Sequence, residues 1–216
     1  MSIDRAGFPA IAVAALPAVV SALSGAASLA AGLLLIPIVI ALFFRDPERT
    51  PPTDEDLVLA PADGKVMFAG DGRAGETPPG TWRQVTIFLS PLDVHINRTP
   101  VSGRVVRVDY RAGSFLPAYD ARAHANEQSE IWFDHDGQTI VARQVVGVLA
   151  RRVVCRLKVG DAVTAGARFG VMKFGSRMDV FLPVRAEVLV QAGEHVVAGE
   201  TVLARLPPRA VAGSVA

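Results

Sequence analysis

Residues 171–181, Val171-Met172-Lys173-Phe174-Gly175-Ser176-Arg177-Met178-Asp179-Val180-Phe181, place a Gly-Ser pair between two apolar runs of strand-forming residues. Glycine has no Cβ, so its carbonyl is open to approach and its backbone can hold a strained turn. The hydroxyl of Ser176 is adjacent to the Gly175 carbonyl and could attack it if a base removed its proton. Because Gly-Ser pairs are also common in ordinary tight turns, the rest of the chain must decide between these interpretations.

Much of the chain beyond this stretch has strand character. His135-Asp136-Gly137-Gln138 carries the Asp-Gly pair of a hairpin turn, and Asp71–Arg83, with three glycines and two prolines, is expected to be a loop. Ala118–Ala125 is expected to form a short helix. Seven segments rich in β-branched and aromatic residues are the predicted strands: Val85–Leu89, Val105–Tyr110, Ile131–Asp134, Thr139–Val145, Val153–Leu157, Met178–Leu182 and Ala186–Val190. The predicted class is mainly β (α+β).

Two pairs of segments repeat each other. PADGKV at 61–66 resembles PVSGRV at 100–105, and GDAVTAG at 160–166 resembles GEHVVAG at 193–199. The pattern G-x-x-V-x-A-G is typical of the turns in the flattened β-sandwich of biotinyl and lipoyl carrier domains. We therefore expect a quasi-symmetric, biotinyl/lipoyl-like sandwich. The alternative is that glycine turns between strands look alike by chance.

The N-terminal part is a long apolar stretch without charged residues between Gly7 and Phe44. It divides into Phe8–Leu23 and Ala26–Phe44, and the second part would reach about 28 Å as a helix, close to the thickness of a bilayer core. We expect residues 1–50 to form a helical membrane anchor, either a hairpin or one span with a shallow segment. The helix should stop near Asp46, which precedes a proline.

Two alternatives to the anchor were weighed. A signal peptide is disfavoured because the apolar stretch is too long and no A-x-A-like cleavage site follows it. A helix pair buried in a protein core is the other. Arg5, Arg45 and Arg49 flank the stretch. If both apolar parts span, both ends lie on the cytoplasmic side of the cell membrane, where we expect the β-rich catalytic domain, residues 51–216.

Composition narrows the function classes. The 216 residues are 50% hydrophobic, with a mean hydropathy of +0.34 and a net charge of +1, so no field or basic stripe recruits nucleic acid. The single cysteine, Cys155, lies in a strand-like run and is expected to be a small core residue. A four-cysteine metal site is excluded, and no metal is expected.

His95 is the strongest candidate for a base. It follows the apolar strand at 85–89 and lies in SPLDVHINRTP, residues 90–100, where a rigid scaffold would end among polar side chains. A histidine can take and return a proton at neutral pH. His135 and His195 fall in turns and are expected to be solvated, whereas His124 is either a surface or a site residue.

Asp63 is the candidate carboxylate. It precedes a glycine in Pro61-Ala62-Asp63-Gly64, so a turn role is the simple interpretation. The functional interpretation is a carboxylate that orients a histidine, as the third member of a nucleophile, base and orienter set. The sequence alone does not show that Asp63, His95 and Ser176 meet in space.

In their order and spacing these residues resemble the phosphatidylserine decarboxylase proenzymes of the short type. The resemblance covers nearly the whole chain. It rests on five fragments: FFRDP at 43–47, APADG at 60–64, SPLDVHINRTP at 90–100, NE at 126–127 and FGSR at 174–177.

This resemblance implies a cofactor that the chain makes from itself. Ser176 attacks the Gly175 carbonyl, with His95 as base and Asp63 holding the imidazole. The resulting ester eliminates to leave dehydroalanine, which loses ammonia and becomes an N-terminal pyruvoyl group. The large β chain, residues 1–175, and the small α chain, residues 176–216, would remain a heterodimer and could assemble further into homo-oligomers.

The implied activity is phospholipid biosynthesis at the membrane. The pyruvoyl ketone of the mature enzyme would form a Schiff base with the amine of phosphatidylserine and act as an electron sink while CO₂ leaves. His95 is the expected acid that protonates the carbon, and phosphatidylethanolamine is the product. An apolar pocket should favour loss of CO₂.

The chain departs from the longer members of this family at two points. Many of them carry a second histidine three positions after the one matched by His95, to which the base role in self-cleavage is assigned, whereas this chain has Arg98. They also tend to have Leu-Gly-Ser-Thr where this chain has Phe-Gly-Ser-Arg. We therefore expect His95 to serve in both processing and turnover, with Arg98 and Arg177 as phosphate contacts suggested by charge alone.

Two rival functions remain open from the sequence. VMKF at 171–174 is similar to the Met-Lys-Met hairpin that biotinyl domains modify, so Lys173 could carry biotin or lipoate in a membrane-tethered carrier or adaptor module. A membrane-tethered serine hydrolase could use Ser176 as a stable nucleophile, but residues 174–178 do not match the G-x-S-x-G elbow.

Overall fold

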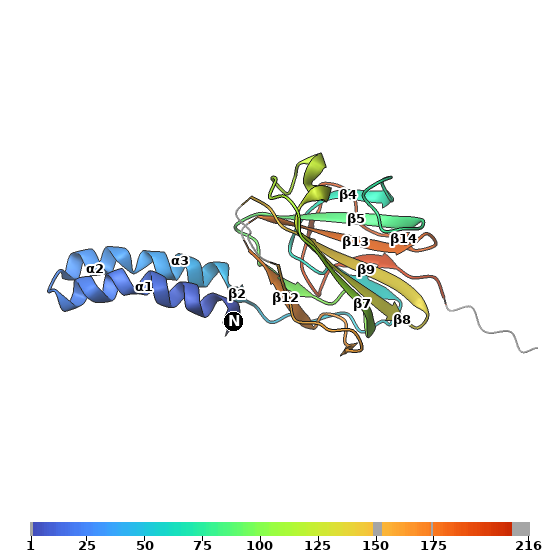
Figure 1. Cartoon of the computed structure of the whole chain (residues 1–216). Helices are drawn as coiled ribbons and strands as arrows, with labels where there is room; N and C mark the ends of the chain where they lie inside the picture. Colours follow the sequence, from blue (N-terminus) through green and yellow to red (C-terminus); the bar gives the residue numbers. More distant parts are fainter. Residues whose placement is uncertain (1, 149–152, 174, 209–216) are drawn as a thin grey trace, which may run out of the picture.

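The computed structural model describes residues 2–148, 153–173 and 175–208. A helical hairpin projects from one end of a β-rich body, and the described part of the C-terminal segment ends on the opposite side of that body (Figure 1). The architecture is mainly β with an N-terminal apolar helical segment, as predicted.

Three helices form the hairpin. They are α1 (Phe8–Leu23), α2 (Ala27–Leu33) and α3 (Leu35–Phe43), preceded by a 3₁₀ turn, η1 (Arg5–Gly7). Gly25, in the turn between α1 and α2, has a φ of 82°, a left-handed conformation that glycine adopts without strain. The two predicted apolar segments are therefore confirmed as helices to within about a turn, including the stop before Asp46.

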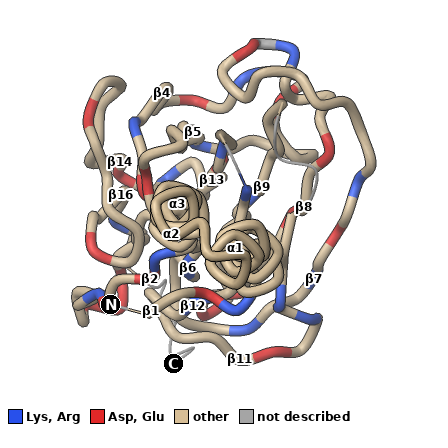
Figure 2. Tube along the Cα trace, turned by 90° about the vertical axis from the view of Figure 1, so that its left-hand side faces the viewer, with Lys and Arg blue, Asp and Glu red and all other residues tan. Residues whose placement is uncertain are grey.

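The hairpin is apolar on all sides. Figure 2 shows no charged residue along α1, α2 or α3, while charges surround the hairpin on the body. Only 11% of the most apolar window of residues 5–23 is buried, and Leu23 is 84% exposed. The alternative of a helix pair buried in the chain's own core is therefore wrong. Arg5–Leu23 is long and apolar enough to cross a membrane, whereas Ala27–Phe43 is shorter.

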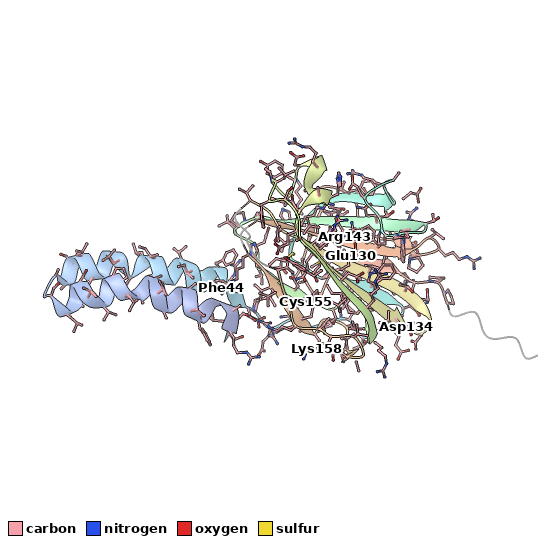
Figure 3. All side chains as sticks on the ribbon, viewed as in Figure 1. Phe44, Glu130, Asp134, Arg143, Cys155 and Lys158 are labelled. Atoms are coloured by element: carbon pink, nitrogen blue, oxygen red, sulfur yellow. The ribbon has the colours of Figure 1, made fainter. Side chains whose placement is uncertain are left out.

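The base of the hairpin is fixed to the body by aromatic packing and a short ribbon. β1 (Ser2–Ile3) pairs with β2 (Arg45–Asp46), on either side of the helices. Phe44, labelled in Figure 3 at the junction, is 2% exposed and packs with Phe43, Val94 and Ile96 in a separate apolar cluster. The hairpin therefore meets the body next to the segment that carries His95.

One curled sheet of eight strands dominates the body. Its order is β11-β7-β8-β9-β13-β5-β4-β15, and all pairings are antiparallel. The strands are β4 (Gly64–Asp71), β5 (Trp82–Leu89), β7 (Gly103–Arg111), β8 (Gln128–His135), β9 (Gln138–Val145), β11 (Ala162–Val163), β13 (Ser176–Pro183) and β15 (His195–Val196).

Two three-stranded sheets complete the body. One has the order β10-β12-β6, from Val153–Cys155, Arg168–Met172 and Ile96–Arg98, and the other β14-β16-β3, from Glu187–Val188, Val202–Arg205 and Leu57–Leu59. Apolar side chains from all three sheets form the main core. Cys155 is half-buried and packs against that core, and its burial raises the pKa of the thiol.

The repeated segments occupy equivalent places. β4 pairs with β15 at one edge of the large sheet, and β7 pairs with β11 at the other. The registers correspond as well, since Gly64 faces Val196 and Gly103 faces Val163. Both glycines have left-handed φ values, 150° and 142°. The expected quasi-symmetry is therefore present in the topology.

The sequence located most long strands but missed several short ones. The predicted loop and hairpin turn are confirmed between β4 and β5 and between β8 and β9, and η2 (Ala121–Ala125), a 3₁₀ turn, replaces the expected short helix. All seven predicted strands are found with other bounds: five are longer in the structure, and two, at 153–157 and 186–190, are shorter. The strands β1, β2, β3, β4, β6, β11, β12, β15 and β16 were not predicted. β6 is buried in all three residues and therefore lacks the alternation that marks a strand in sequence.

Candidate active site

The strand β13 places Ser176 inside the body. Ser176 is paired with Leu89 of β5, and the next residue, Arg177, is paired with Val145 of β9. Ser176 is fully buried, and its Oγ has no hydrogen-bond partner among the described residues. A buried hydroxyl without a partner costs about 1–3 kcal/mol, so such groups in native structures call for a reason.

Gly175 has a backbone conformation that favours glycine. Its φ is 68°, in the left-handed region, and nothing lies within 4 Å of the place where a Cβ would be. Its N–H donates to Nε2 of His95, with an N–N distance of 3.4 Å. The structure therefore brings His95 next to Gly175, the neighbour of Ser176, although Ser176 Oγ itself makes no hydrogen bond with the ring. Phe174 lies outside the described residues.

His95 is oriented as a hydrogen-bond acceptor at Nε2. Its Nδ1 lies 2.9 Å from the carbonyl oxygen of Asp93, and a carbonyl can only accept, so Nδ1 carries the proton. Nε2 is therefore the unprotonated nitrogen, and it accepts the Gly175 N–H. The ring is fully buried and stacks on Phe43 with a centroid separation of 4.2 Å. Burial lowers the pKa of His95 to about 4, which keeps the ring neutral at physiological pH.

Asp63 does not occupy the orienting position proposed from sequence. Its carboxylate pairs with Arg49 at 2.8 Å and accepts from the N–H of Ala198 at 2.8 Å. The backbone carbonyl of Asp93, not Asp63, orients His95. Burial raises the pKa of Asp63, and the bonds to Ala198 and Arg49 oppose that change. Asp63 and Arg49 connect the segment after the hairpin to the turn at residue 198.

Arg98 is not available to a lipid phosphate. It is 5% exposed, and its guanidinium donates to Asp46 at 3.1 Å, to the carbonyl of Pro47 at 2.8 Å and to that of Gly166 at 3.0 Å. Sequence could not reveal this, because a buried and an exposed arginine look the same in a composition argument. Arg98 fixes the segment after α3 to the body.

Arg177 is likewise buried and paired. It is 4% exposed, and it forms ion pairs with Asp179 at 2.9 Å and with Glu76 at 3.8 Å. A second buried pair, Arg143 with Glu130, lies on the same sheet (Figure 3). The expectation of a phosphate contact is wrong for Arg177 in this structure, because its charge is already neutralised by carboxylates.

Two hollows flank the site. A cavity of about 240 Å³ is lined by Gly175, Val148, Phe88, Tyr119 and Pro91, among others. A larger one of about 520 Å³ lies at the base of the hairpin and is lined by Phe43, Leu42, Arg45, Leu92 and again Pro91. Both are lined mainly by apolar side chains, and Pro91 borders both. The cavity lined by Gly175 and the one at the base of the apolar hairpin therefore lie on either side of Pro91.

The other histidines lie away from this arrangement. His195 and His124 are exposed, as expected for His195. The expectation of a solvated His135 is wrong: it is 6% exposed, because its Nδ1 bonds the carbonyl of Ser102 at 2.7 Å. Within the described residues no group of His, Cys, Asp and Glu could hold a metal ion.

The sequence did not predict three groups that lie near Gly175 and His95. Phe43 stacks on His95, Asp93 orients it through its backbone, and Gly147 lies against the Gly175 carbonyl. Phe43 and Asp93 are in the quoted fragments, but nothing in the sequence signals their contacts. Gly147 has no local signal at all.

Comparisons with known proteins are consistent across nearly the full chain. The family model described as phosphatidylserine decarboxylase matches residues 37–204. A phosphatidylserine decarboxylase proenzyme of Geotalea uraniireducens is 43% identical over 203 residues, 93% of this chain and 95% of the relative. Proenzymes of the same name from Pelodictyon phaeoclathratiforme, 48% identical over 76% of this chain and 77% of the relative, and Anaplasma phagocytophilum, 42% identical over 98% and 94%, also match.

Proposed function

The chain belongs to the phosphatidylserine decarboxylase family, and from the geometry above we propose that it cleaves itself between Gly175 and Ser176 and turns Ser176 into the pyruvoyl group of the mature enzyme. The observation that carries the proposal is the buried, unpartnered Ser176 Oγ next to a left-handed Gly175 whose N–H bonds His95. The enzyme converts phosphatidylserine to phosphatidylethanolamine and CO₂.

The first step is an intramolecular acyl shift. In the proposed step the Ser176 hydroxyl turns toward His95 Nε2 and displaces the Gly175 N–H that Nε2 accepts in the structure. The unprotonated Nε2 takes the hydroxyl proton, and the oxygen attacks the Gly175 carbonyl carbon. The C–N bond breaks and the new amine takes a proton, so the Gly175 acyl group passes from nitrogen to oxygen. Loss of the Ser176 α-proton then expels the Gly175 carboxylate and leaves dehydroalanine. Tautomerisation and hydrolysis release ammonia and leave a ketone at residue 176.

The residues present suit this chemistry. The ketone supplies an electron sink for the carbanion that remains when CO₂ leaves. His95 stays in place to return a proton to that carbon, since the Asp93 carbonyl and the Phe43 ring hold its imidazole. The apolar walls around Gly175 exclude water from the reacting carboxylate.

The hairpin and the hollow at its base support a lipid substrate that approaches from the membrane. The exposed apolar hairpin supports membrane association, with residues 1–50 as anchor and residues 51–216 as the catalytic body on the cytoplasmic face. The hollow at its base would take the acyl portion of the lipid. Arg45 is the cation in that wall, and its guanidinium donates only to the carbonyls of Leu42 and Leu92 in the described structure. We assign the lipid phosphate to Arg45 in place of Arg98 and Arg177.

The finer fold assignment belongs with this proposal. The two equivalent edges of the large sheet and the matching three-stranded sheets support a duplicated, flattened sandwich of the biotinyl/lipoyl type. The carrier function is not supported, because the relatives are decarboxylase proenzymes. Lys173 is half-buried, with its Nζ 5.9 Å from the centre of the Phe44 ring.

The test is an intact-mass measurement on the native chain and on Ser176→Ala. The native chain should give a large fragment ending at Gly175 and a small one starting with a pyruvoyl group, whereas Ser176→Ala should stay full-length and inactive. Hydroxylamine should abolish turnover by the mature enzyme, because it captures the ketone. An uncleaved native chain that still decarboxylates the lipid, or that reacts with a fluorophosphonate as a serine hydrolase would, contradicts the proposal.

A further inference from the structure

Gly147 lies directly opposite the proposed scissile residue. The antiparallel register of β9 and β13 pairs Val145 with Arg177. Two residues after Val145 and two residues before Arg177, the same register places Gly147 opposite Gly175. A methyl group built on Gly147 would lie 3.0 Å from the Gly175 carbonyl carbon and overlap its oxygen. The Gly175 carbonyl oxygen therefore occupies the space that any side chain at 147 would fill.

The clash is specific to the carbonyl. Gly147 is not among the glycines with left-handed φ, so an alanine there would meet no backbone strain of its own. The next nearest atom is the Cβ of Ala118, at 3.5 Å, which is ordinary contact. Within the described residues, the Gly175 peptide is thus the one group that forbids a side chain at this position.

The segment that carries Gly147 is held from both sides and cannot easily retreat. The N–H of Val146 donates to the carbonyl of Glu127 at 3.1 Å, and the carbonyl of Val146 accepts from Nδ2 of Asn126 at 2.8 Å. The Asn126 side chain is fully buried and also bonds both backbone groups of Leu116. Asn126 therefore fastens the end of β9 to the neighbouring loop.

We propose that Gly147 is a positioning residue for self-cleavage: it forms a seat that fixes the Gly175 carbonyl for attack by Ser176, and Asn126 holds that seat in place. His95 restrains the nitrogen of Gly175, and Gly147 limits its carbonyl from the opposite strand. A carbonyl displaced by even about 1 Å loses much of the advantage of an intramolecular attack. This inference rests on the proposed function, because it concerns the same bond.

The test compares Gly147→Ala with the native chain and with Gly70→Ala. Gly70 is a suitable control because its added Cβ would meet only a side chain at 3.4 Å and its φ is not left-handed. Full-length chains are synthesised, synthesis is stopped, and cleavage after Gly175 is followed by gel and intact mass. Gly147→Ala should cleave about tenfold more slowly or not at all, while Gly70→Ala follows the native rate.

Hydroxylamine distinguishes a misplaced Gly175 carbonyl from a general loss of structure as the cause of slow cleavage. It cleaves the ester that the acyl shift creates, so it should release little fragment from a folded Gly147→Ala chain, in which the shift itself is impaired. Rapid hydroxylamine cleavage of that variant would mean that the ester forms normally, and the inference would be wrong. Circular dichroism and limited proteolysis report whether the variant is folded.

If Gly147→Ala does not fold, Asn126→Asp carries the test. It preserves the shape of the side chain but replaces the donor to the Val146 carbonyl by an oxygen, which loosens Gly147 without adding atoms there. Cleavage that is slower by about threefold or more, and that hydroxylamine does not accelerate, supports the role of Gly147 in positioning the Gly175 carbonyl. Cleavage at the native rate contradicts that role. A native chain that is not cleaved at all would instead refute the proposed function.

Discussion

Lowering the pH tests the state of His95, on which the proposed self-cleavage depends. Burial lowers the pKa of this imidazole to about 4, and the bond to the Asp93 carbonyl opposes that change only in part. A base with a pKa of about 4 is roughly 97% neutral at pH 5.5, whereas a histidine with the ordinary value is only about 9% neutral there. The cleavage rate at pH 5.5 should therefore equal the rate at pH 7.5 within about 10%, and an ordinary histidine would slow it about tenfold.

Lowering the pH should also reduce the free energy of unfolding through His95, whereas it would increase the free energy of unfolding for a histidine held in a salt bridge. Between pH 6.5 and about 4 the unfolded chain binds a proton at residue 95 that the folded chain does not, so stability falls as the pH falls through this window. The full loss corresponds to about 3 kcal/mol. His95→Gln removes this contribution, so its stability relative to the parent should rise as the pH is lowered.

The protonation of His95 and the pH dependence of cleavage can each be measured directly. Ser176→Ala, expected to stay uncleaved, is labelled with ¹⁵N-histidine in detergent micelles, and His95→Gln in the same background assigns the signal of residue 95. Cleavage of freshly synthesised native chain is followed after a pH jump. A midpoint at pH 6 or above for His95 in the folded precursor would refute the reasoning, as would a tenfold loss of cleavage at pH 5.5.

Two further predictions concern the arginines. Arg98→Met should destabilise the Ser176→Ala precursor by about 2–4 kcal/mol, measured by urea unfolding. It removes one of the two ion-pair partners of the buried Asp46 and leaves three hydrogen bonds unmade. The control, Arg185→Met at an exposed position, should change stability by less than about 0.5 kcal/mol. Arg45→Gln should raise the KM for phosphatidylserine in mixed micelles by about three- to tenfold with little change in kcat, since a phosphate contact acts on binding. An unchanged KM, or an equal effect of Arg185→Gln, would remove Arg45 from the binding site.

The sequence by itself indicated the candidate reacting groups and the apolar segments, because their signals are local. Gly175 and Ser176 are neighbours in the chain, and the apolar segments at 8–23 and 26–44 are read directly from the absence of charge. The long strands were found for the same reason, since each carries its own pattern. The repeated glycine turns also indicated the quasi-symmetry that the topology shows at both edges of the large sheet.

Only the tertiary structure decided what surrounds these groups. Asp63, Arg98 and Arg177 have the charges that the sequence argument required, but folding gives them other partners: Arg49, Asp46 and Asp179. The orienting group of His95 is a backbone carbonyl, which every residue has and no pattern marks. Gly147 meets Gly175 through strand pairing between distant segments. Residue types and their immediate neighbours indicate which groups could react. The contacts, the burial and the pKa of His95 arise only when the sheets bring separate segments together.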